Sequence, residues 1–420
     1  MKTNQDIIKW VDENQKQFIE MSDKIWEWAE LPWREFKSSK LQTDFLKKEG
    51  FQITWDIENI NTAFVAEWGD GTPVLGFAGE YDALLGLSQK NQSHKEPIRE
   101  GAPGHGCGHN LLGVGCLSAA VAVKTWLESN GTKGTVRYYG CPAEEGGSAK
   151  AFMARGGVFN DLDAAFNFHP GSVNMPTKGS CVGVNHIRFR FHGTSSHAGG
   201  SPHLGRSALD GVELMNVGVN YLREHVTEKV RIHYVITHGG DLPNVVPAEA
   251  EVWYYIRAFK PDELEEVTNR VRKIADGAAL MTETSWEEIF ESATSALISN
   301  HYLADLQYKA MKEIGPIEYS DAEITYAQEI NSAYPEENIN NFFDYMESKN
   351  IPAEFKGMKD EFFEKPLIGD NFPAFDEGAI ETGSTDVGDL SQITPLSMLS
   401  TTCWPIAVPG HSWGNVATGA

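Results

Sequence analysis

The residues with the clearest chemical potential lie in the glycine-rich stretch 104–110, which reads Gly-His-Gly-Cys-Gly-His-Asn. In an extended segment, residues i and i+2 project from the same face, so Cys107 and His109 can converge on one point. Thiolate and imidazole are both good ligands for zinc and related metals. A small buried cysteine beside a histidine that caps a helix would explain the same residues without a metal. Taken alone, the pair leaves both interpretations open.

Further ligand types stand at the ends of two predicted strands, 135–140 and 163–168. Glu144 and Glu145 follow the first strand, and because adjacent side chains diverge, one can bind a metal while the other acts on water. Without a cation, two carboxylates forced together would repel each other. His169 ends the second strand. The ordinary alternatives are a solvated acidic turn and a turn or core histidine.

The last candidate ligand, His411, lies in the turn Pro-Gly-His-Ser-Trp at 409–413, far away in the sequence. Spacing alone does not prove that these side chains meet. If they do, they supply enough ligands for one or two divalent ions: Cys107, His109, one of the two glutamates, His169 and His411.

Four more residues have the chemistry to support such a site. Asp82 follows a predicted strand and could accept the second N–H of a ligating histidine. His197, in a stretch rich in glycines and hydroxyls, could donate to an oxyanion. Asn244 and Arg257 could hold a substrate carbonyl or carboxylate, arginine through a bidentate fork. A strand-end cap, a hairpin turn, a turn residue and a strand-face charge are the competing explanations.

Short apolar runs, typical of strands, alternate along the chain with segments of helical periodicity. This order predicts an α/β fold, with a mostly parallel mixed sheet and helices on both faces. In such sheets, ligands bind beyond the carboxyl ends of the strands, where the candidate residues stand. The strands are predicted at 62–68, 73–78, 135–140 and 163–168, and the helices at 5–30 and 111–127.

Residues 185–297 have a different pattern, β-α-β-β-α-β, which is that of a ferredoxin-like α+β unit. We expect them to form a compact domain inserted into a catalytic domain of 1–184 and 298–420. The segment 300–366 is acidic and predicted to be mostly helical. The inserted elements are predicted as strands at 184–192, 230–237, 248–257 and 285–290, with helices at 207–224 and from 261.

Composition excludes several classes of function. The 420 residues are 41% apolar, so a sizeable core can form, and 59 acidic against 35 basic side chains give a net charge of −24. This acidity disfavours nucleic acid as a partner. No apolar stretch long enough for a signal peptide or a membrane span is evident, and five scattered cysteines fit a reduced compartment. We therefore expect a cytoplasmic protein that binds no membrane.

Several motifs are incomplete or missing. No stretch completes a dinucleotide fingerprint, a phosphate-binding loop or a Gly-x-Ser-x-Gly elbow. Nucleotide binding at 104–108 is therefore disfavoured. A non-catalytic binding protein on a hydrolase scaffold is the alternative from a different class.

Together the motifs resemble the M-twenty family of cocatalytic metallopeptidases, in its amidohydrolase branch of aminoacylases and aminobenzoyl-glutamate hydrolases. The resemblance extends over about 340 residues in family order, with the inserted domain in the expected place. The matching segments are 80–84 (Glu-Tyr-Asp-Ala-Leu), 106–110 (Gly-Cys-Gly-His-Asn), 142–147 (Pro-Ala-Glu-Glu-Gly-Gly), 167–171 (Asn-Phe-His-Pro-Gly), 195–198 (Ser-Ser-His-Ala), 244–247 (Asn-Val-Val-Pro) and 410–411 (Gly-His).

The resemblance implies hydrolysis of the amide bond of an N-acyl amino acid, an aminobenzoyl-glutamate-like compound or a dipeptide by metal-activated water. A dipeptidase or carboxypeptidase of the same family is the alternative within it. Glu144 would be the general base and His197 would stabilise the oxyanion. Two divalent ions, zinc or manganese, would be held by five residues: Cys107, His109, Glu145, His169 and His411.

The resemblance has further implications for the rest of the chain. Asn244 and Arg257 would help to hold the substrate, and the inserted lid domain would form a homodimer. The wider family has a histidine ligand where this chain has Glu80. Family members usually continue after the last histidine with a packed helix, whereas this chain ends at Ala420, so we expect a shortened end.

Overall fold

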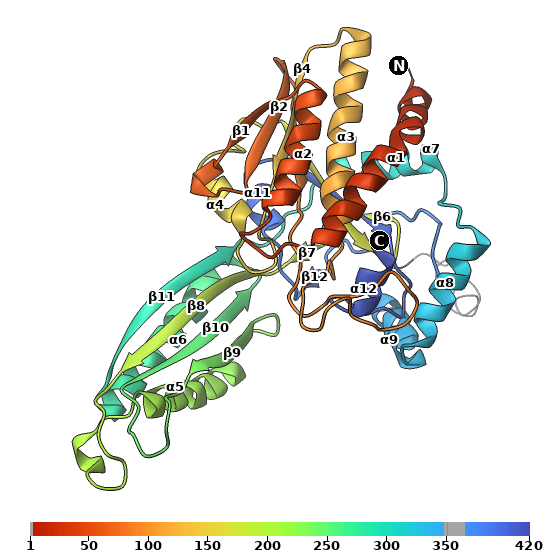
Figure 1. The fold of residues 1–420 in the computed structure, drawn as a ribbon. Helices are drawn as coiled ribbons and strands as arrows, with labels where there is room; N and C mark the ends of the chain where they lie inside the picture. The colour runs from red at the N-terminus through yellow and green to blue at the C-terminus, as the bar shows by residue number, and fades with distance from the viewer. Residues whose placement is uncertain (1–2, 348–350, 352–365) are drawn as a thin grey trace. The chain divides into compact units, whose positions relative to one another are not determined.

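The computed structural model describes residues 3–347, 351 and 366–420 (Figure 1). Within them the chain forms two compact units, which we describe separately. The first comprises Met1–Gly179, Ile298–Ala379 and Leu390–Ala420, and the second Ser180–Leu297 and Ile380–Asp389.

The second unit contains one segment that the sequence assigned to the catalytic domain. Ile380–Asp389 belongs with it because β12 (Ile380–Glu381) pairs in parallel with β7 (Ser180–Cys181). The start of this unit also lies a few residues before the predicted boundary at 185.

The first unit is built on a seven-stranded mixed sheet. Its central strands β4, β3, β5 and β13 are parallel to one another, whereas the edge strands pair antiparallel. This is the mostly parallel mixed sheet expected from the sequence. In spatial order the strands are β1 (Gln52–Trp55), β2 (Phe64–Asp70), β4 (Gly134–Gly140), β3 (Val74–Gly79), β5 (Ala164–Gly171), β13 (Leu396–Thr402) and β6 (Met175–Pro176).

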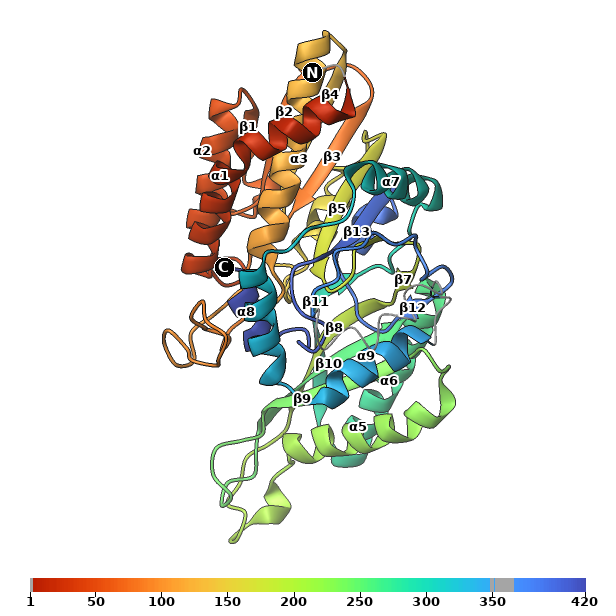
Figure 2. The same cartoon turned by 90° about the vertical axis from the view of Figure 1, so that its right-hand side faces the viewer.

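Helices cover both faces of this sheet. On one face, α1 (Asn4–Trp28) and α2 (Phe36–Lys48) lie beside α3 (His109–Asn130), which packs on the central strands (Figures 1 and 2). Phe77 of β3 belongs to that core, whereas its neighbour Gly76 faces the opposite side. The segment that follows α4 (Ala149–Arg155) lies on this second face of the sheet.

One expectation about α3 is wrong. This helix is long and apolar enough to cross a membrane by length and composition, whereas no such stretch is expected from the sequence analysis. Most of its apolar window is buried inside the structure, where it packs on the sheet. Several other elements, among them α2, β1 and β13, were also not predicted from the sequence.

Further helices follow β11 (Ser285–Thr294) in the chain. The acidic segment predicted as mostly helical contains three helices in its described part, and its residues 348–350 and 352–365 lie outside that part. A short helix whose middle residues are buried follows His411. These helices are α7 (His301–Ile314), α8 (Asp321–Ser332), α9 (Glu336–Glu347), α11 (Val387–Ser391) and α12 (Trp413–Thr418).

The second unit is a four-stranded antiparallel sheet with two helices, in the order of strands that defines a ferredoxin-like fold. One continuous core lies between the sheet and both helices. Along the sheet the strands are β11, β8 (Gly183–His192), β10 (Glu249–Ala258) and β9 (Arg231–His238), and the helices are α5 (Ala208–Leu222) and α6 (Pro261–Thr282).

Glycine makes one close approach possible near the end of β3. A Cβ placed on Gly113 of α3 would lie 2.3 Å from the carbonyl oxygen of Glu80, which follows β3. The absence of a side chain therefore lets the start of α3 lie directly against the carboxyl end of β3.

Replacing Gly113 by alanine tests this approach. Alanine usually stabilises a helix by about 1 kcal/mol relative to glycine. Here we expect a destabilisation of about 1–3 kcal/mol, because the helix must move away from Glu80. Thermal unfolding measures it, with Gly277→Ala in α6 as the control, since nothing lies within 4 Å of that position. A Gly113→Ala protein as stable as the wild type would contradict this packing.

Candidate metal centre and active site

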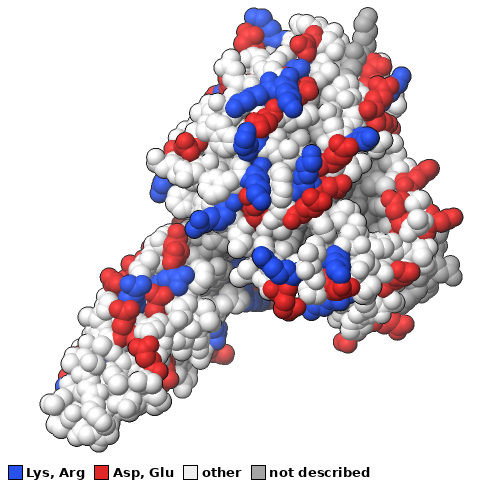
Figure 3. All heavy atoms as spheres, viewed as in Figure 1, with Lys and Arg blue, Asp and Glu red and all other residues white. Residues whose placement is uncertain are grey.

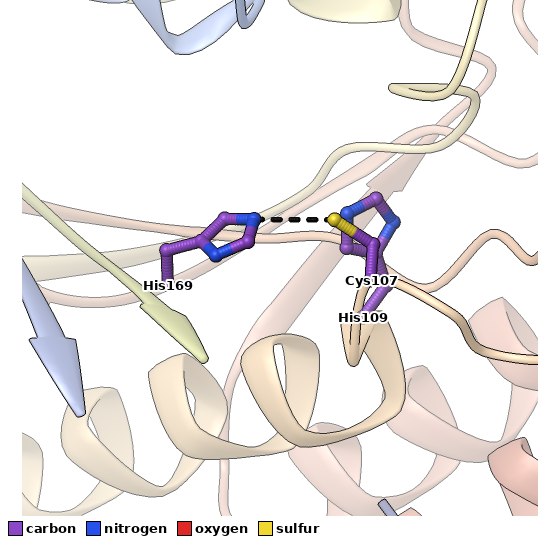
Figure 4. A group of neighbouring side chains, drawn as sticks. All are labelled: Cys107, His109 and His169. Carbon is purple, nitrogen blue, oxygen red and sulfur yellow. Dashed lines mark hydrogen bonds between the residues drawn. The ribbon is translucent and has the colours of Figure 1, made fainter. Parts of the chain in front are cut away.

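A thiol and two imidazoles converge at the carboxyl edge of the central sheet (Figure 4). The Cys107 Sγ lies 3.3 Å from the His169 Nε2. One ligand atom from each of Cys107, His109 and His169 lies within 4.8 Å of the other two. These residues come from the start of α3 and from β5, so the sheet brings together side chains 62 positions apart.

Cys107 and His109 meet by a different geometry from the extended one expected from the sequence. His109 is the first residue of α3. The backbone of Gly108, just before it, has a left-handed conformation with φ of 72°. A Cβ on Gly108 would also lie 2.9 Å from the Cγ of Pro170. The turn at Gly108, rather than an extended strand, therefore brings the thiol and the imidazole together.

The two histidines present the same ring nitrogen to this centre. His109 Nδ1 lies 2.9 Å from Asp82 Oδ1, and His169 Nδ1 lies 2.7 Å from the carbonyl oxygen of Pro170. If each Nδ1 carries the proton and donates it there, each Nε2 keeps its lone pair for a metal. In metal sites a carboxylate or a backbone carbonyl usually accepts the second N–H of a ligating imidazole in this way.

A second group of ligand atoms shares Cys107 with the first. Cys107, Glu145 and His411 also place one ligand atom each within 4.8 Å of one another. The His411 Nε2 is 3.4 Å from Glu145 Oε1. The backbone N–H of Glu145 donates to Asp82 Oδ2 at 2.9 Å. Asp82 therefore orients both His109 and the loop that carries Glu145.

Glu144 points to the other side of the same centre. Its Oε2 lies 3.9 Å from His109 Nε2, and it forms a third candidate ligand group with Glu80 and His109. The two neighbouring glutamates thus diverge, one towards His109 and the other towards His411. This is the arrangement in which one carboxylate can bind a metal while its neighbour handles a proton.

Glu80 takes part in a buried ion pair that no sequence pattern indicated. Its Oε1 lies 2.8 Å from the Nζ of Lys150, and both side chains are fully or almost fully buried, at 2% and 0% exposed. Its Oε2 lies 3.2 Å from His109 Nε2. Lys150 therefore compensates one of the carboxylates that crowd this centre. A lysine in a short helix is usually exposed, so its type gave no signal of this role.

Burial and charge shift the pKa values of the central pair in opposite directions. Burial raises the pKa of Asp82, but the adjacent His109 and hydrogen bonds lower it to below its usual value overall. Burial lowers the pKa of His109, but Asp82 and the Cys107 thiol raise it well above its usual value overall. The carboxylate-rich surroundings thus favour positive charge at His109, which a proton on Nε2 supplies without a metal and a bound cation would supply in its place.

The residues at this centre fit a divalent cation. The His109 Nε2 and the Glu145 Oε1 are both buried and make no hydrogen bond with any of the described residues. Buried polar atoms without a hydrogen bond are rare, and a bound cation would satisfy both. Cysteine, histidine and carboxylate ligands suit zinc, while the carboxylates also accept manganese.

His197 and Asn244 lie in two loops of the second unit that hold each other. The N–H of Ala198 donates to the carbonyl oxygen of Asn244 at 2.9 Å, and His197 forms a β-bridge with Val245. The N–H of Gly200 donates to His197 Nδ1 at 2.9 Å. This fixes the tautomer with the proton on Nε2, which leaves an exposed N–H donor.

Arg257 of β10 is a half-buried cation without a carboxylate partner among the described residues. Its Nη1 donates to Ser384 Oγ at 2.6 Å. Burial lowers the pKa of Arg257. Burial and Arg257 together lower the pKa of His186 to about 4, so this neighbour is neutral at physiological pH. An arginine in these surroundings is well suited to accept an anion.

Removal of the buried ammonium group of Lys150 tests the charge balance at the metal centre. Lys150→Met leaves the buried Glu80 carboxylate without its positively charged partner. We therefore expect a loss of about 3–5 kcal/mol in the free energy of unfolding. Urea unfolding measures it. The double variant Lys150→Met/Glu80→Gln removes both charges and should recover most of the loss. Equal stability of the single variant and the wild type would argue against a compensating role for Lys150.

Comparison with known proteins finds a matching family model and similar relatives. The sequence model of peptidase family M20/M25/M40 matches residues 76–368. The chain is 40% identical to one of the subunits of p-aminobenzoyl-glutamate hydrolase from Escherichia coli (strain K12), over 99% of this chain and 87% of that protein. It is 31% identical to the Xaa-Arg dipeptidase of Mus musculus, over 65% of this chain and 62% of that protein.

A solved structure has a similar fold. The crystal structure of a dinuclear metal binding peptidase of the M20 family from Bacillus subtilis matches with a TM-score of 0.53 at 16% identity, over 96% of this chain and 95% of that one. The family model spans most of the chain, and the Escherichia coli relative matches nearly all of it. The chain is therefore a member of peptidase family M20/M25/M40.

Proposed function

We propose that this chain is a metal-dependent amidohydrolase that cleaves the amide bond of N-acyl amino acids of the p-aminobenzoyl-glutamate type, and of dipeptides that resemble them. The observation that carries this proposal is the position of Glu144, beside His109 but outside the Cys107–Glu145–His411 group. The relatives described as a p-aminobenzoyl-glutamate hydrolase subunit and as a dipeptidase support the substrate class.

In the proposed mechanism, Glu144 takes a proton from the attacking water on its carboxylate and later returns it to the leaving amine nitrogen. Two divalent ions held by Cys107, His109, Glu145, His169 and His411 would lower the pKa of the water and polarise the amide carbonyl. Asp82 would accept the Nδ1–H of His109 and so leave its Nε2 for a metal. His197 would donate its Nε2–H to the oxyanion that forms at the former carbonyl.

Substrate binding needs a local cation, because the chain as a whole carries a net charge of −24. On the face shown in Figure 3, acidic and basic side chains lie intermixed. Arg257 is half-buried, and none of the described carboxylates pairs with it. We assign it to the free carboxylate of the amino-acid part of the substrate, with Asn244 as a further contact.

Assembly and location belong to the same proposal. The edge strand β9 exposes Val235 and Ile236, and α5 exposes Val217 and Tyr221. These apolar residues support a homodimer through the inserted lid domain. The Escherichia coli relative is described as one subunit of its enzyme, which points to a second kind of chain as the alternative partner. A cytoplasmic location stays a prediction.

Glu144→Gln tests the mechanism. The amide keeps the size of the side chain but cannot accept the proton, so we expect kcat for p-aminobenzoyl-glutamate to fall by about 10²–10⁴-fold. Elemental analysis of the same sample should show the wild-type metal content. Unchanged turnover with metal bound would exclude Glu144 as the base.

Arg257→Gln tests the assignment of the substrate carboxylate. Loss of a charge-assisted hydrogen bond costs about 1.5–3 kcal/mol, so KM should rise by roughly 10–100-fold. Steady-state kinetics measure it, with the α-amide of the substrate as the control, because its KM should change far less. If both compounds lose affinity equally, Arg257 does not bind the carboxylate.

A further inference from the structure

Glu35 is a completely buried carboxylate that the mechanism above does not use. It is the residue just before α2, at 0% exposed, yet its side chain does not cap its own helix. No lysine or arginine of the described residues pairs with it. Burial and the nearby Asp82 raise the pKa of Glu35 to about 7. Burying a carboxylate costs free energy unless hydrogen bonds compensate for the lost contact with water.

Three donors from separate parts of the chain converge on this carboxylate. The N–H of Ala143 donates to Oε1 at 2.9 Å, and the N–H of Trp33 donates to the same oxygen at 3.0 Å. The hydroxyl of Thr62 donates to Oε2 at 3.0 Å. Glu35 thus ties the start of α2 to a segment 108 positions further along the chain.

Ala143 is the point from which the loop with the two glutamates starts. It is left-handed, with φ of 55°, a conformation that is unfavourable for a residue with a Cβ. Its carbonyl oxygen accepts the N–H of Gly147 at 2.9 Å and of Ser148 at 2.8 Å. The N–H of Ala143 thus ties the loop to Glu35. The carbonyl oxygen of Ala143 closes the loop on itself.

The loop closed in this way carries Glu144 and Glu145. A shift at Ala143 moves Glu144 relative to His109, from which it lies 3.9 Å away. We propose that Glu35 is a positioning residue that fixes this loop, and with it the proton-transferring carboxylate, through the N–H of Ala143. This inference rests on the proposed function of Glu144.

The competing explanation is that Glu35 only stabilises the start of α2. Glu30 offers a matched comparison, because it performs that task in the same segment. Its carboxylate accepts the N–H of Lys37 at 3.0 Å and the N–H and hydroxyl of Ser38, both at 2.8 Å. These hydrogen bonds hold α2 and do not involve the 143–148 loop.

Two substitutions separate geometry from charge at Glu35. Glu35→Gln keeps an oxygen where Oε1 accepts both N–H groups, and its amide can donate to Thr62. Glu35→Asp keeps the charge but withdraws the oxygens by one methylene. A displacement of about 1 Å can cost 10²-fold in rate, so we expect kcat of the aspartate variant to fall by about that factor with KM nearly unchanged. The glutamine variant should keep most of the wild-type kcat.

The control and a second readout make the test decisive. Glu30→Asp should lower the melting temperature but leave kcat unchanged. Cobalt(II) in place of the native metal provides a spectrum that reports on Glu145 in the same loop. Glu35→Asp should change this spectrum and Glu35→Gln should not. If the wild type cleaves no tested amide, the proposed function fails, while the cobalt spectra still test the positioning.

Specific results would overturn the inference: a wild-type kcat and spectrum for Glu35→Asp, a larger loss for Glu35→Gln than for Glu35→Asp, or an equal loss of kcat for Glu30→Asp. If Glu35→Asp does not fold, Thr62→Val takes its place, because it removes only one donor to Glu35. Its kcat should then fall by a smaller factor, and an unchanged kcat and spectrum would count against the inference.

Discussion

The parallel pairing of β3 with β4 and β5 is the constraint on which the candidate site depends. Gly79 pairs with Gly140, and Phe77 with Phe166, so the ends of these strands reach the same edge of the sheet. Asp82, the 143–148 loop and His169 therefore lie close together although they are far apart in sequence. A slip of one residue in this register would turn the side chains to the wrong face.

Charge is the second problem that the structure solves at this edge. Glu80, Asp82 and Glu144 lie close to the buried His109, Glu145 follows Glu144 in the chain, and Glu35 lies near Asp82. Lys150 pairs with Glu80, His109 pairs with Asp82, and neutral hydrogen-bond donors surround Glu35. Repulsion among carboxylates is thereby limited before any cation binds, which leaves Glu145 and the Nε2 of His109 for the metal.

The sequence predicted the parts of the fold and site that have local signals. Apolar runs ending in chemically capable residues located the strand ends, and the β-α-β-β-α-β order located the ferredoxin-like unit. Glu35 and Lys150 were missed because their residue types usually lie in solvent, and their burial depends on distant contacts. The left-handed turn at Gly108 was also missed, since a glycine does not reveal its φ.

The most direct test measures metal content and p-aminobenzoyl-glutamate hydrolysis on the same purified protein. We predict up to two divalent ions per chain and turnover that rises with metal content, disappears on chelation and returns when the metal is restored. Turnover that persists in metal-free protein would contradict a metal-dependent mechanism. A metal-loaded protein that cleaves neither this compound nor other N-acyl amino acids and dipeptides would contradict the proposed activity.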